Sequence, residues 1–421
     1  MQKMRKMKAS GIEWIGEIPE GWEIKYFVQL FSQVKNKNIG LCEKNLLSLS
    51  YGKIKQKSIE TVGGLLPDNF EGYNIIDRND IVLRLTDLQN DQHSLRVGLS
   101  HERGIITSAY CSIRVRGAES PNYLYYYLHT FDIAKGFYGM GSGVRQGLNW
   151  DGLKYIKILL PPQHEQDRIS VFLNQKTLEI DSMLSKTISS IEEYKKLKQA
   201  VITQAVTKTI YDDFGNPSKF RKLRSLCNVL SKGTTPKDIE TQNDEFYCIR
   251  YLKSENIVSN QLNLNPTFFI TAETNNSLER SKLNSGDILF VIAGASIGKV
   301  AITTADFLPA NTNQAVAFIR LSSSYQYATK YIWYFLQSDV VKQLIALSAV
   351  QSAQPNLSLE DLGAMRLPLP DQMGCLKITD YLDAKCAEID KLIAKKEQLV
   401  KELESYKKSL IYEVVTGKRE V

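Results

Sequence analysis

The stretch that decides the fold is LPPQHEQDRISVFL at Leu160–Leu173, where a double proline leads into a run with the apolar spacing of a helix. A related stretch, LPDQMGCLKITDYL, lies 209 residues later at Leu369–Leu382. When residues 148–207 are aligned with residues 357–416 at this offset, 17 of 60 positions are identical and no gap is needed. The same transition occurs twice, so the sequence predicts an internal duplication.

The duplication extends upstream of these stretches. YLYYYLHT from Tyr123 corresponds to YIWYFLQS from Tyr331, and DIVL from Asp80 corresponds to DILF from Asp287, at nearly the same offset. Each half is therefore a variable block followed by a better-preserved tail. We expect a first block over residues 1–160, a tail over 161–210, a second block over 211–369 and a tail over 370–421.

Both tails are predicted to be long helices. The first has no proline or glycine between Pro162 and Gly215, and the second has only Gly374 between Pro370 and Gly417. A helix of about 45 residues is about 68 Å long and cannot bury its apolar stripe alone. The stripe has near-heptad spacing, which favours a coiled coil of the two helices; the alternative is that each stripe packs on its own block. The expected pairing residues are Ile180, Met183, Tyr194, Leu197, Val201, Ile389, Leu392, Leu399, Leu403, Tyr406 and Leu410.

The two blocks are predicted to be mainly β-structure. Short runs rich in Val, Ile, Tyr and Phe, such as IIDRNDIVLRL at Ile75–Leu85 and DILFVIA at Asp287–Ala293, are separated by Gly, Asn and Asp. One helix is expected in each block, at Tyr123–Phe137 and at Tyr327–Ala346. The predicted fold class is α+β, with two mainly-β domains, two long helices and a pseudo-two-fold internal repeat.

Composition narrows the classes of function. The net charge of +7, from 53 basic and 46 acidic residues, is compatible with an anionic partner such as nucleic acid. The six cysteines form no C-x-x-C pair and the four histidines are scattered, so no metal site is expected and the cysteine usage fits a reducing cytosol. We therefore expect a cytoplasmic protein without a signal peptide or a membrane span.

Two glycine-rich motifs fall short of a cofactor site. FYGMGSG at Phe137–Gly143 resembles the cofactor loop of amino-methyltransferases, but the N/D-P-P-Y/F motif of their catalytic site is missing. GASIGKV at Gly294–Val300 has one residue too few for a phosphate loop, and Val300 stands where a hydroxyl is needed, so we expect a turn between two strands. The sequence shows no nucleophile–base pair, so a recognition or scaffold protein is favoured over an enzyme. A self-contained methyltransferase and a scaffold that does not bind DNA stay as the alternatives.

Two lysine-rich segments are candidates for contact with DNA. LSKGTTPKD at Leu230–Asp238 and SYGKIKQKS at Ser50–Ser58 combine lysines, which neutralise phosphates, with hydroxyl and amide side chains, which can bond base edges. The competing interpretation is a solvated basic loop. The predicted DNA contacts are Lys53, Lys55 and Arg84 in the first block, and Lys232, Thr234, Thr235, Lys237 and Lys299 in the second.

The order of motifs resembles a known family. Its carriers are SGIEWIGEIPEGWE at Ser10–Glu23, the tail start LPPQHEQDRI, KGTTPK from Lys232, SAQPNLS at Ser352–Ser358 and VTGK at Val415–Lys418. Together they resemble the DNA-specificity subunit of type I restriction–modification systems over essentially the whole chain. One departure is that the P-P-x-x-E-Q signature is intact only in the first tail. Another is that the N-terminal segment has barely any second copy.

The resemblance implies a division of labour. Two target-recognition domains would each read one half of a split, asymmetric site in double-stranded DNA, and the two helices would pair antiparallel and separate them. Each half would recruit one copy of an adenine-N6 methyltransferase subunit, and restriction–translocase subunits would complete the nuclease. The chain itself would be non-catalytic, and S-adenosylmethionine, ATP and Mg²⁺ would belong to its partners.

Overall fold

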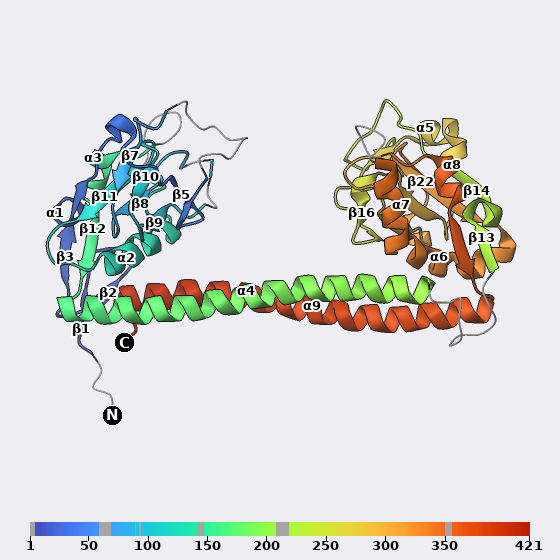
Figure 1. Ribbon diagram of the computed structural model, residues 1–421. Coiled ribbons are helices and arrows are strands. Elements are labelled where there is room, and N and C mark those ends of the chain that lie inside the picture. The colour runs from blue at the N-terminus through green and yellow to red at the C-terminus, as the bar shows by residue number, and fades with distance from the viewer. Residues whose placement is uncertain are drawn as a thin grey trace. The chain divides into compact units, whose positions relative to one another are not determined.

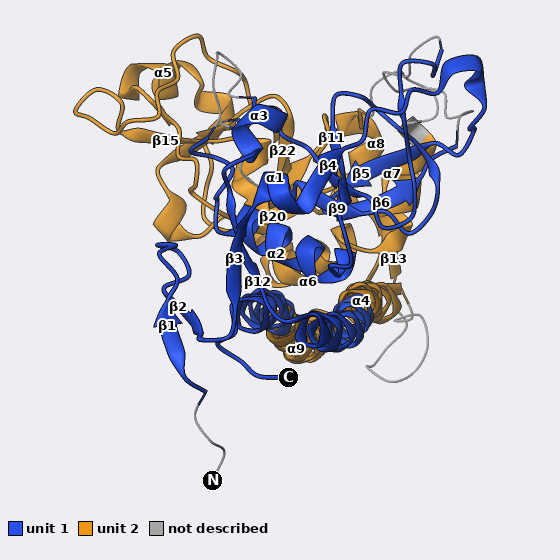
Figure 2. Ribbon diagram, turned by 90° about the vertical axis from the view of Figure 1, so that its left-hand side faces the viewer, with its two compact units in different colours: residues 1–187, 398–421 blue, residues 188–397 orange. Residues whose placement is uncertain are grey.

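In the computed structural model of the chain, the described residues are 5–58, 69–88, 90–91, 94–140, 147–207, 219–349 and 356–421. They form two compact units: unit 1 holds residues 1–187 and 398–421, and unit 2 holds residues 188–397 (Figure 2). Two long helices, α4 (Gln163–Thr207) and α9 (Gln372–Val415), each contribute a segment to both units (Figure 1). No helix within the described residues is long and apolar enough to cross a membrane.

The block of unit 1 is built around a four-stranded antiparallel sheet in the order β4-β11-β8-β9. Its strands are β4 (Phe31–Gln33), β8 (Ile81–Leu83), β9 (Val97–Leu99) and β11 (Cys111–Val115). Three short helices accompany it: α1 (Phe27–Leu30), α2 (Pro121–Ile133) and α3 (Trp150–Leu153). The remaining strands pair in twos: β1 (Met7–Ala9) with β2 (Glu17–Pro19), β3 (Glu23–Tyr26) with β12 (Lys157–Leu160), β5 (Leu47–Ser50) with β6 (Lys53–Gln56), and β7 (Asn74–Ile76) with β10 (Gly104–Ile106).

The block of unit 2 repeats this plan with a four-stranded antiparallel sheet in the order β14-β22-β19-β20. Its strands are β14 (Cys227–Lys232), β19 (Ile288–Val291), β20 (Val300–Ile302) and β22 (Val316–Leu321). The other strands are β13 (Lys219–Lys222) with β23 (Arg366–Leu369), β15 (Ile249–Leu252) between β18 (Phe269–Ile270) and β21 (Ala310–Thr312), and β16 (Ile257–Val258) with β17 (Gln261–Leu262). Its helices besides the long pair are α5 (Ala272–Ser277), α6 (Thr329–Leu336), α7 (Asp339–Ala349) and α8 (Leu359–Ala364).

An ion pair between a buried aspartate and a more exposed arginine occupies the same place in each sheet. Asp80, before β8, accepts two hydrogen bonds of 2.7 Å from Arg114 on β11. Asp287, before β19, accepts hydrogen bonds of 2.8 and 2.7 Å from Arg320 on β22. Both carboxylates are almost fully buried, and a buried charge needs such a partner. The predicted α+β class and internal repeat are confirmed at the level of these contacts.

A second matched pair ties each block to the helices. The Tyr123 hydroxyl on α2 donates to the carbonyl oxygens of Leu159 and Val415, at 3.0 and 3.3 Å. In unit 2 the Tyr331 hydroxyl on α6 donates to Pro368 and Val206, at 2.6 and 3.2 Å. Each tyrosine therefore joins its block to the C-terminal end of one long helix. Apolar side chains of both helices also lie in the core of each block, Leu173 and Leu410 in unit 1 and Ile202 and Leu382 in unit 2, so the stripes pack on the blocks as well as on each other.

Within each unit the segments of α4 and α9 run antiparallel. In unit 1 the Lys407 ammonium binds Asp181, and in unit 2 the Lys198 ammonium binds Asp390 at 2.6 Å. These are the same pair under the repeat, because Asp181 corresponds to Asp390 and Lys198 to Lys407 at the offset of 209. The ion pair thus holds the same helix register in both units.

One predicted helix is divided. In place of a single helix over Tyr327–Ala346, the chain forms the end of a 3-10 helix (Ser323–Ala328), then α6 and α7, with a break at Gln337 and Ser338. The backbone groups released there are satisfied by α4: the Gln199 amide donates to the carbonyl oxygen of Gln337 at 2.7 Å. The Asp339 N–H donates to the Thr203 hydroxyl at 3.0 Å. Packing against α4 therefore supplies partners that a continuous helix would not need.

Candidate nucleic-acid interface

The predicted DNA contacts of unit 2 gather at one end of its four-stranded sheet. Lys232 lies opposite Ala317, Ala317 opposite Phe290, and Phe290 opposite Val300, so the four residues form one row across the sheet. With strands about 4.8 Å apart, this row places Lys232 at the end of β14 and Val300 at the start of β20 about 14 Å from each other, and Lys299 is next to Val300. Two basic residues therefore flank the same end of the sheet.

The loop after β14 is fixed at its base and exposed at its tip. The Gly233 N–H donates to Val316 at 3.2 Å, and the Thr234 N–H donates to Thr312 at 3.1 Å. A Cβ at Gly233 would lie 1.8 Å from the Thr312 carbonyl oxygen, so only glycine fits this approach. The side chains of Thr234, Thr235 and Lys237 are exposed just beyond. They project from the sheet end that also carries Lys232.

The strand pairing identifies a lysine of unit 1 that the sequence interpretation missed. Ser32 lies opposite Arg114 and Val229 lies opposite Arg320, and these two arginines hold the equivalent buried aspartates. Three residues further on stand Lys35 in unit 1 and Lys232 in unit 2, both exposed. The segment after β4 is thus the positional counterpart of KGTTPK. The lysine-rich Ser50–Ser58, which resembles KGTTPK in composition, lies elsewhere in its block, at the β5–β6 hairpin.

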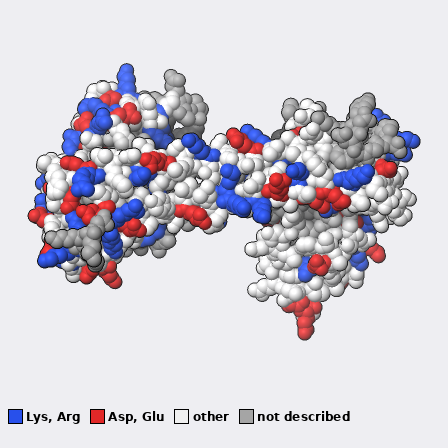
Figure 3. Space-filling model, turned by 90° about the horizontal axis from the view of Figure 1, so that it is seen from below, with Lys and Arg blue, Asp and Glu red and all other residues white. Residues whose placement is uncertain are grey.

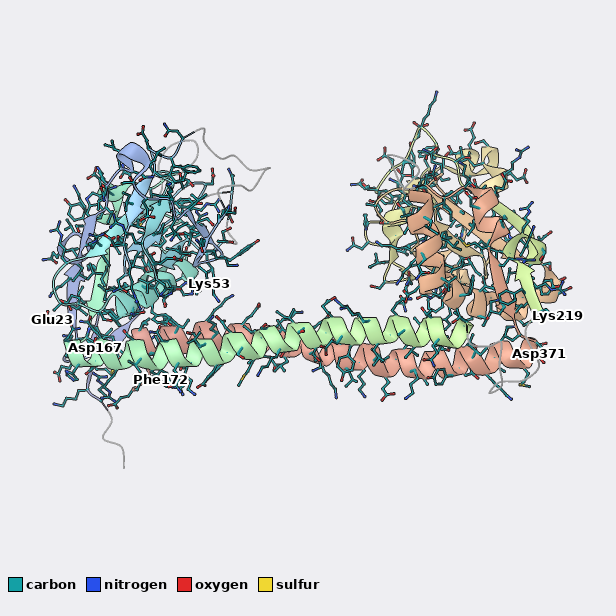
Figure 4. All side chains as sticks on the ribbon, viewed as in Figure 1. Glu23, Lys53, Asp167, Phe172, Lys219 and Asp371 are labelled. Carbon is teal, nitrogen blue, oxygen red and sulfur yellow. The ribbon has the colours of Figure 1, made fainter. Side chains whose placement is uncertain are left out.

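The three predicted contacts in unit 1 have different surroundings. Lys53, on β6, binds the Asp181 carboxylate of α4 at 2.8 Å, and Figure 4 shows it on the side of its block toward that helix. Arg84 binds Asp91 at 3.3 Å. Lys55 is exposed on the same hairpin as Lys53. All three stay predictions, but only Lys55 presents its ammonium without an ion pair among the described residues.

The Asp181 carboxylate accepts from two lysines, Lys53 and Lys407. Burial alone would raise the pKa of Asp181, but these two hydrogen bonds outweigh it and hold that pKa below its ordinary value. The carboxylate is therefore ionised at neutral pH and ties the β5–β6 hairpin to the helix pair. The corresponding Asp390 of unit 2 is bound by Lys198.

The predicted pairing residues of the helices differ in burial. Ile180, Ile389 and Leu410 are buried, Tyr194, Val201, Leu392 and Leu403 are half-buried, and Met183, Leu197, Leu399 and Tyr406 are exposed. Ile191, beside the predicted seam, is buried at 7% exposure. The seam is thus filled in part, and each unit leaves large apolar side chains of the helices in water.

The charges do not form one continuous basic face on the side that Figure 3 shows. Lys and Arg side chains alternate there with Asp and Glu in both units. A basic surface for a polyanion must then come from local groups such as the sheet-end lysines. Within the described residues no group of three or more His, Cys, Asp and Glu could hold a metal ion.

Two equivalent units, each with a mainly-β block and a part of one helix pair, define the chain as an internally duplicated α+β protein. Residues 216–402 match the family described as "Type I restriction modification DNA specificity domain". The specificity subunit of the type I restriction enzyme EcoBI from Escherichia coli is 27% identical over 56% of this chain and 53% of its own length. The putative type I restriction enzyme MjaX specificity subunit from Methanocaldococcus jannaschii is 23% identical over 96% of this chain and 95% of its own length.

Solved structures share the fold. A chain from work on the complex assembly and conformational transition of the type I R-M system aligns over 96% of this chain and 99% of its own, with a TM-score of 0.73 and 14% identity. The HsdS subunit from Thermoanaerobacter tengcongensis aligns over 96% and 98% with a TM-score of 0.51 and 14% identity. The chain is thus similar, over nearly its whole length, to specificity subunits of type I restriction–modification systems, and residues 216–402 match the model of their DNA specificity domain.

Proposed function

We propose that each unit reads one half of a bipartite, asymmetric target in double-stranded DNA. The observation that supports this is the shared sheet end: Lys35, just after β4, and Lys232, the last residue of β14, are exposed at equivalent positions of the two units. The loops that follow differ in sequence, VKNKN against KGTTPK, so the two half-sites should differ as well. Lysine contributes affinity through phosphates, while the Asn and Thr side chains nearby can bond base edges.

The salt dependence of DNA binding tests this assignment. In the complex with the methyltransferase partner, Lys232→Ala and Lys35→Ala should each flatten the slope of log K against log salt by about one unit, because each removes one phosphate contact. Lys25→Ala is the matched control. Lys25 lies on β3, outside the four-stranded sheet, and its ammonium already binds Glu119 at 3.5 Å. Slopes equal to that of the wild type in both test variants would refute the assignment.

The helix pair is proposed to recruit one adenine-N6 methyltransferase subunit per unit. Each unit leaves apolar helix side chains exposed, including Val171 and Leu178 in unit 1 and Met373 and Leu376 in unit 2. Val171 and Leu178 are seven residues apart, so they lie on one face of α4. Such a face is typical of a surface that another helix covers. We further propose that the lengths of α4 and α9 set the spacer between the half-sites.

Subunit exchange measured by size-exclusion chromatography tests the recruitment. Leu178→Glu should release the methyltransferase subunit held by unit 1, whereas Ser189→Glu, which adds the same charge to an exposed position of α4 three turns away, should not. Equal retention of the partner by both variants would contradict the proposed surface.

The chain is proposed to be non-catalytic, with S-adenosylmethionine held by the methyltransferase subunits and with ATP and Mg²⁺ held by the restriction–translocase subunits. Calorimetry of the isolated chain should give no binding of S-adenosylmethionine; measurable binding would favour the self-contained methyltransferase. Mapping of methylated adenine in a host that expresses the system should return a split target. A complex that shifts no DNA at any salt concentration would favour a scaffold instead.

A further inference from the structure

Arg96 is a fully buried arginine at the foot of the loop between β8 and β9. The loop runs from Arg84 to Leu95, and the Arg84 N–H donates to the Arg96 carbonyl oxygen at 2.9 Å where the two strands separate. The Arg96 backbone N–H donates to Asp132 on α2 at 2.7 Å. Its backbone therefore stays in the sheet, while its side chain turns into the loop.

The guanidinium of Arg96 has an acceptor for each of its five N–H donors. Nη1 donates to the carbonyl oxygens of Arg84 and Thr86 at 3.1 and 2.7 Å. Nη2 donates to those of Asp87, at 3.1 Å, and Asp91. Nε donates to the Tyr138 hydroxyl at 3.1 Å. Four of the five acceptors are backbone carbonyls of one loop, so the arginine fills the centre of that loop.

None of these acceptors is a carboxylate. A buried cation is costly unless every donor is satisfied, and here the loop backbone supplies most of the acceptors. Any other path of the loop would leave the guanidinium buried with missing partners. The arginine therefore penalises alternative loop conformations far more than a surface contact could. Asp87, at φ +54°, shows that the backbone is bent to meet it.

The described side chains of the loop range from buried to exposed. Leu85 and Leu88 are buried and anchor it, while Thr86 and Asn90 are exposed. Asparagine can bond the edge of adenine with both amide groups, and threonine can bond a base edge or contact a thymine methyl. The loop leaves the sheet beyond Leu83 and Val97, which is the same end that the loop of Lys299 leaves in unit 2.

The repeat gives an internal comparison. Val97 is the first residue of β9 and pairs with Leu83 on β8, and Val300 is the first residue of β20 and pairs with Phe290 on β19. Val97 and Val300 therefore correspond, and so do the residues before them, Arg96 and Lys299. The shorter loop of unit 2 is bent by Gly294 and Gly298, both at φ +87°, and leaves Lys299 half-buried. The same position thus carries an internal cation in unit 1 and a partly exposed one in unit 2.

We infer that Arg96 is a positioning residue for base recognition by unit 1: it fixes the backbone of Arg84, Thr86, Asp87 and Asp91, so that Thr86 and Asn90 meet base edges of the first half-site. This inference rests on the proposed reading of one half-site by each unit. Arg96 itself touches no DNA.

The test uses the full chain in complex with its methyltransferase partner, with a target found by methylation mapping and single-base variants of each half-site. Arg96→Met keeps a long side chain and removes all five donors. It should lower discrimination against wrong bases in the first half-site at least about tenfold, the loss expected when one bidentate base contact is misplaced. Discrimination in the second half-site and the salt slope should stay as in the wild type.

Tyr138→Phe is the second variant, because it removes only one hydroxyl, which accepts from Arg96 Nε and donates to the Asp91 carbonyl oxygen at 3.4 Å, and it should keep the fold. It should lower first-half-site discrimination by a smaller factor. The inference would be overturned if Tyr138→Phe left first-half-site discrimination unchanged and Arg96→Met either left it unchanged too or failed to assemble. A salt slope flattened by about one unit with discrimination intact would also overturn it, because Arg96 would then be a phosphate contact. A wild-type complex without any bipartite target would refute the proposed function instead.

Discussion

His129 and Asp132, one turn apart on α2, are buried groups with pKa shifts of opposite sense. Burial lowers the pKa of His129 from 6.5 to about 4, and the nearby Lys407 and Lys408 act in the same direction. Burial raises the pKa of Asp132 from 3.8 to about 6, against the hydrogen bond from the Arg96 backbone N–H. Both side chains are less than 10% exposed. The stability of unit 1 should depend on pH through both groups.

The two contributions have opposite signs. Unfolded chains protonate His129 below pH 6.5 and the folded unit only below about 4, so the folded unit loses stability as pH falls. The folded unit protonates Asp132 below about pH 6 and unfolded chains only below 3.8, so this residue adds stability as pH falls. Between pH 7 and pH 4.5 each contribution is about 2 kcal/mol. They nearly cancel in the wild type.

Single substitutions should reveal each contribution. His129→Gln introduces the residue that stands at the corresponding position 337 of unit 2. When the pH is lowered from 7 to 4.5, this variant should gain about 2 kcal/mol of unfolding free energy relative to the wild type, because it lacks the loss that His129 causes. Asp132→Asn keeps an oxygen that can accept from the Arg96 N–H. Over the same pH change it should lose a similar amount of unfolding free energy relative to the wild type. The double variant should follow the wild type.

Urea unfolding followed by tryptophan fluorescence measures this quantity in unit 1. Three of the four tryptophans, Trp14, Trp22 and Trp150, are in unit 1, and a Trp333→Phe background removes the fourth. Because each variant is compared with the same background at both pH values, other titrating groups cancel. Two single variants that shift the pH dependence in the same direction, or not at all, would refute the reasoning.

Three further outcomes are expected. Asp287→Asn should destabilise unit 2 by about 2 kcal/mol, because Arg320 loses its carboxylate partner. Asp80→Asn should destabilise unit 1 by less, because Arg114 keeps Asp77 at 2.6 Å. Hydrogen exchange of β22 and of β11 measures the two effects. Gly233→Ala should destabilise unit 2 by more than about 1 kcal/mol, since its Cβ meets backbone, and thermal unfolding checks it. Seven residues inserted in each long helix at matched positions should lengthen the target spacer by at most about three base pairs and leave both half-sites unchanged, as methylation mapping would show. Changed half-sites would contradict the spacer role.

The duplication and the two long helices were predictable from the sequence because both follow from residues that are close together along the chain. A constant offset aligns the tails without structural knowledge, and the absence of proline and glycine predicts a continuous helix. The strand at DILFVIA and the turn at GASIGKV were predictable for the same reason. The structure confirms β19, β20 and the turn between them. The remainder of FYGMGSG from Gly141 and most of SAQPNLS lie outside the described residues.

The candidate site was less predictable because strand pairing decides it. Lys35 is recognised as the counterpart of Lys232 only once Ser32 is seen opposite Arg114, 82 residues away. Lys53 was chosen for its charge, but its ion pair with Asp181 joins residues 128 positions apart. Charge and loop position gave no sign of which basic side chain turns inward, as Arg96 does. Exposure of a cation is a property of packing, and it cannot be read from composition.

The departure of the second tail from the P-P-x-x-E-Q signature has a structural cause. In unit 1 Glu165 accepts hydrogen bonds from Arg5, at 2.5 and 2.7 Å, and from the Trp22 indole at 2.8 Å. Among the residues of unit 2 that the structure describes, no segment corresponds to the N-terminal one that provides these donors, so a carboxylate at position 374 would lack such partners among them. Gly374 stands there instead, and its N–H donates to Asp371 at 2.7 Å, which caps α9 as firmly as a helix start requires. The glutamate of the signature therefore serves the packing of the N-terminal segment rather than the start of the helix.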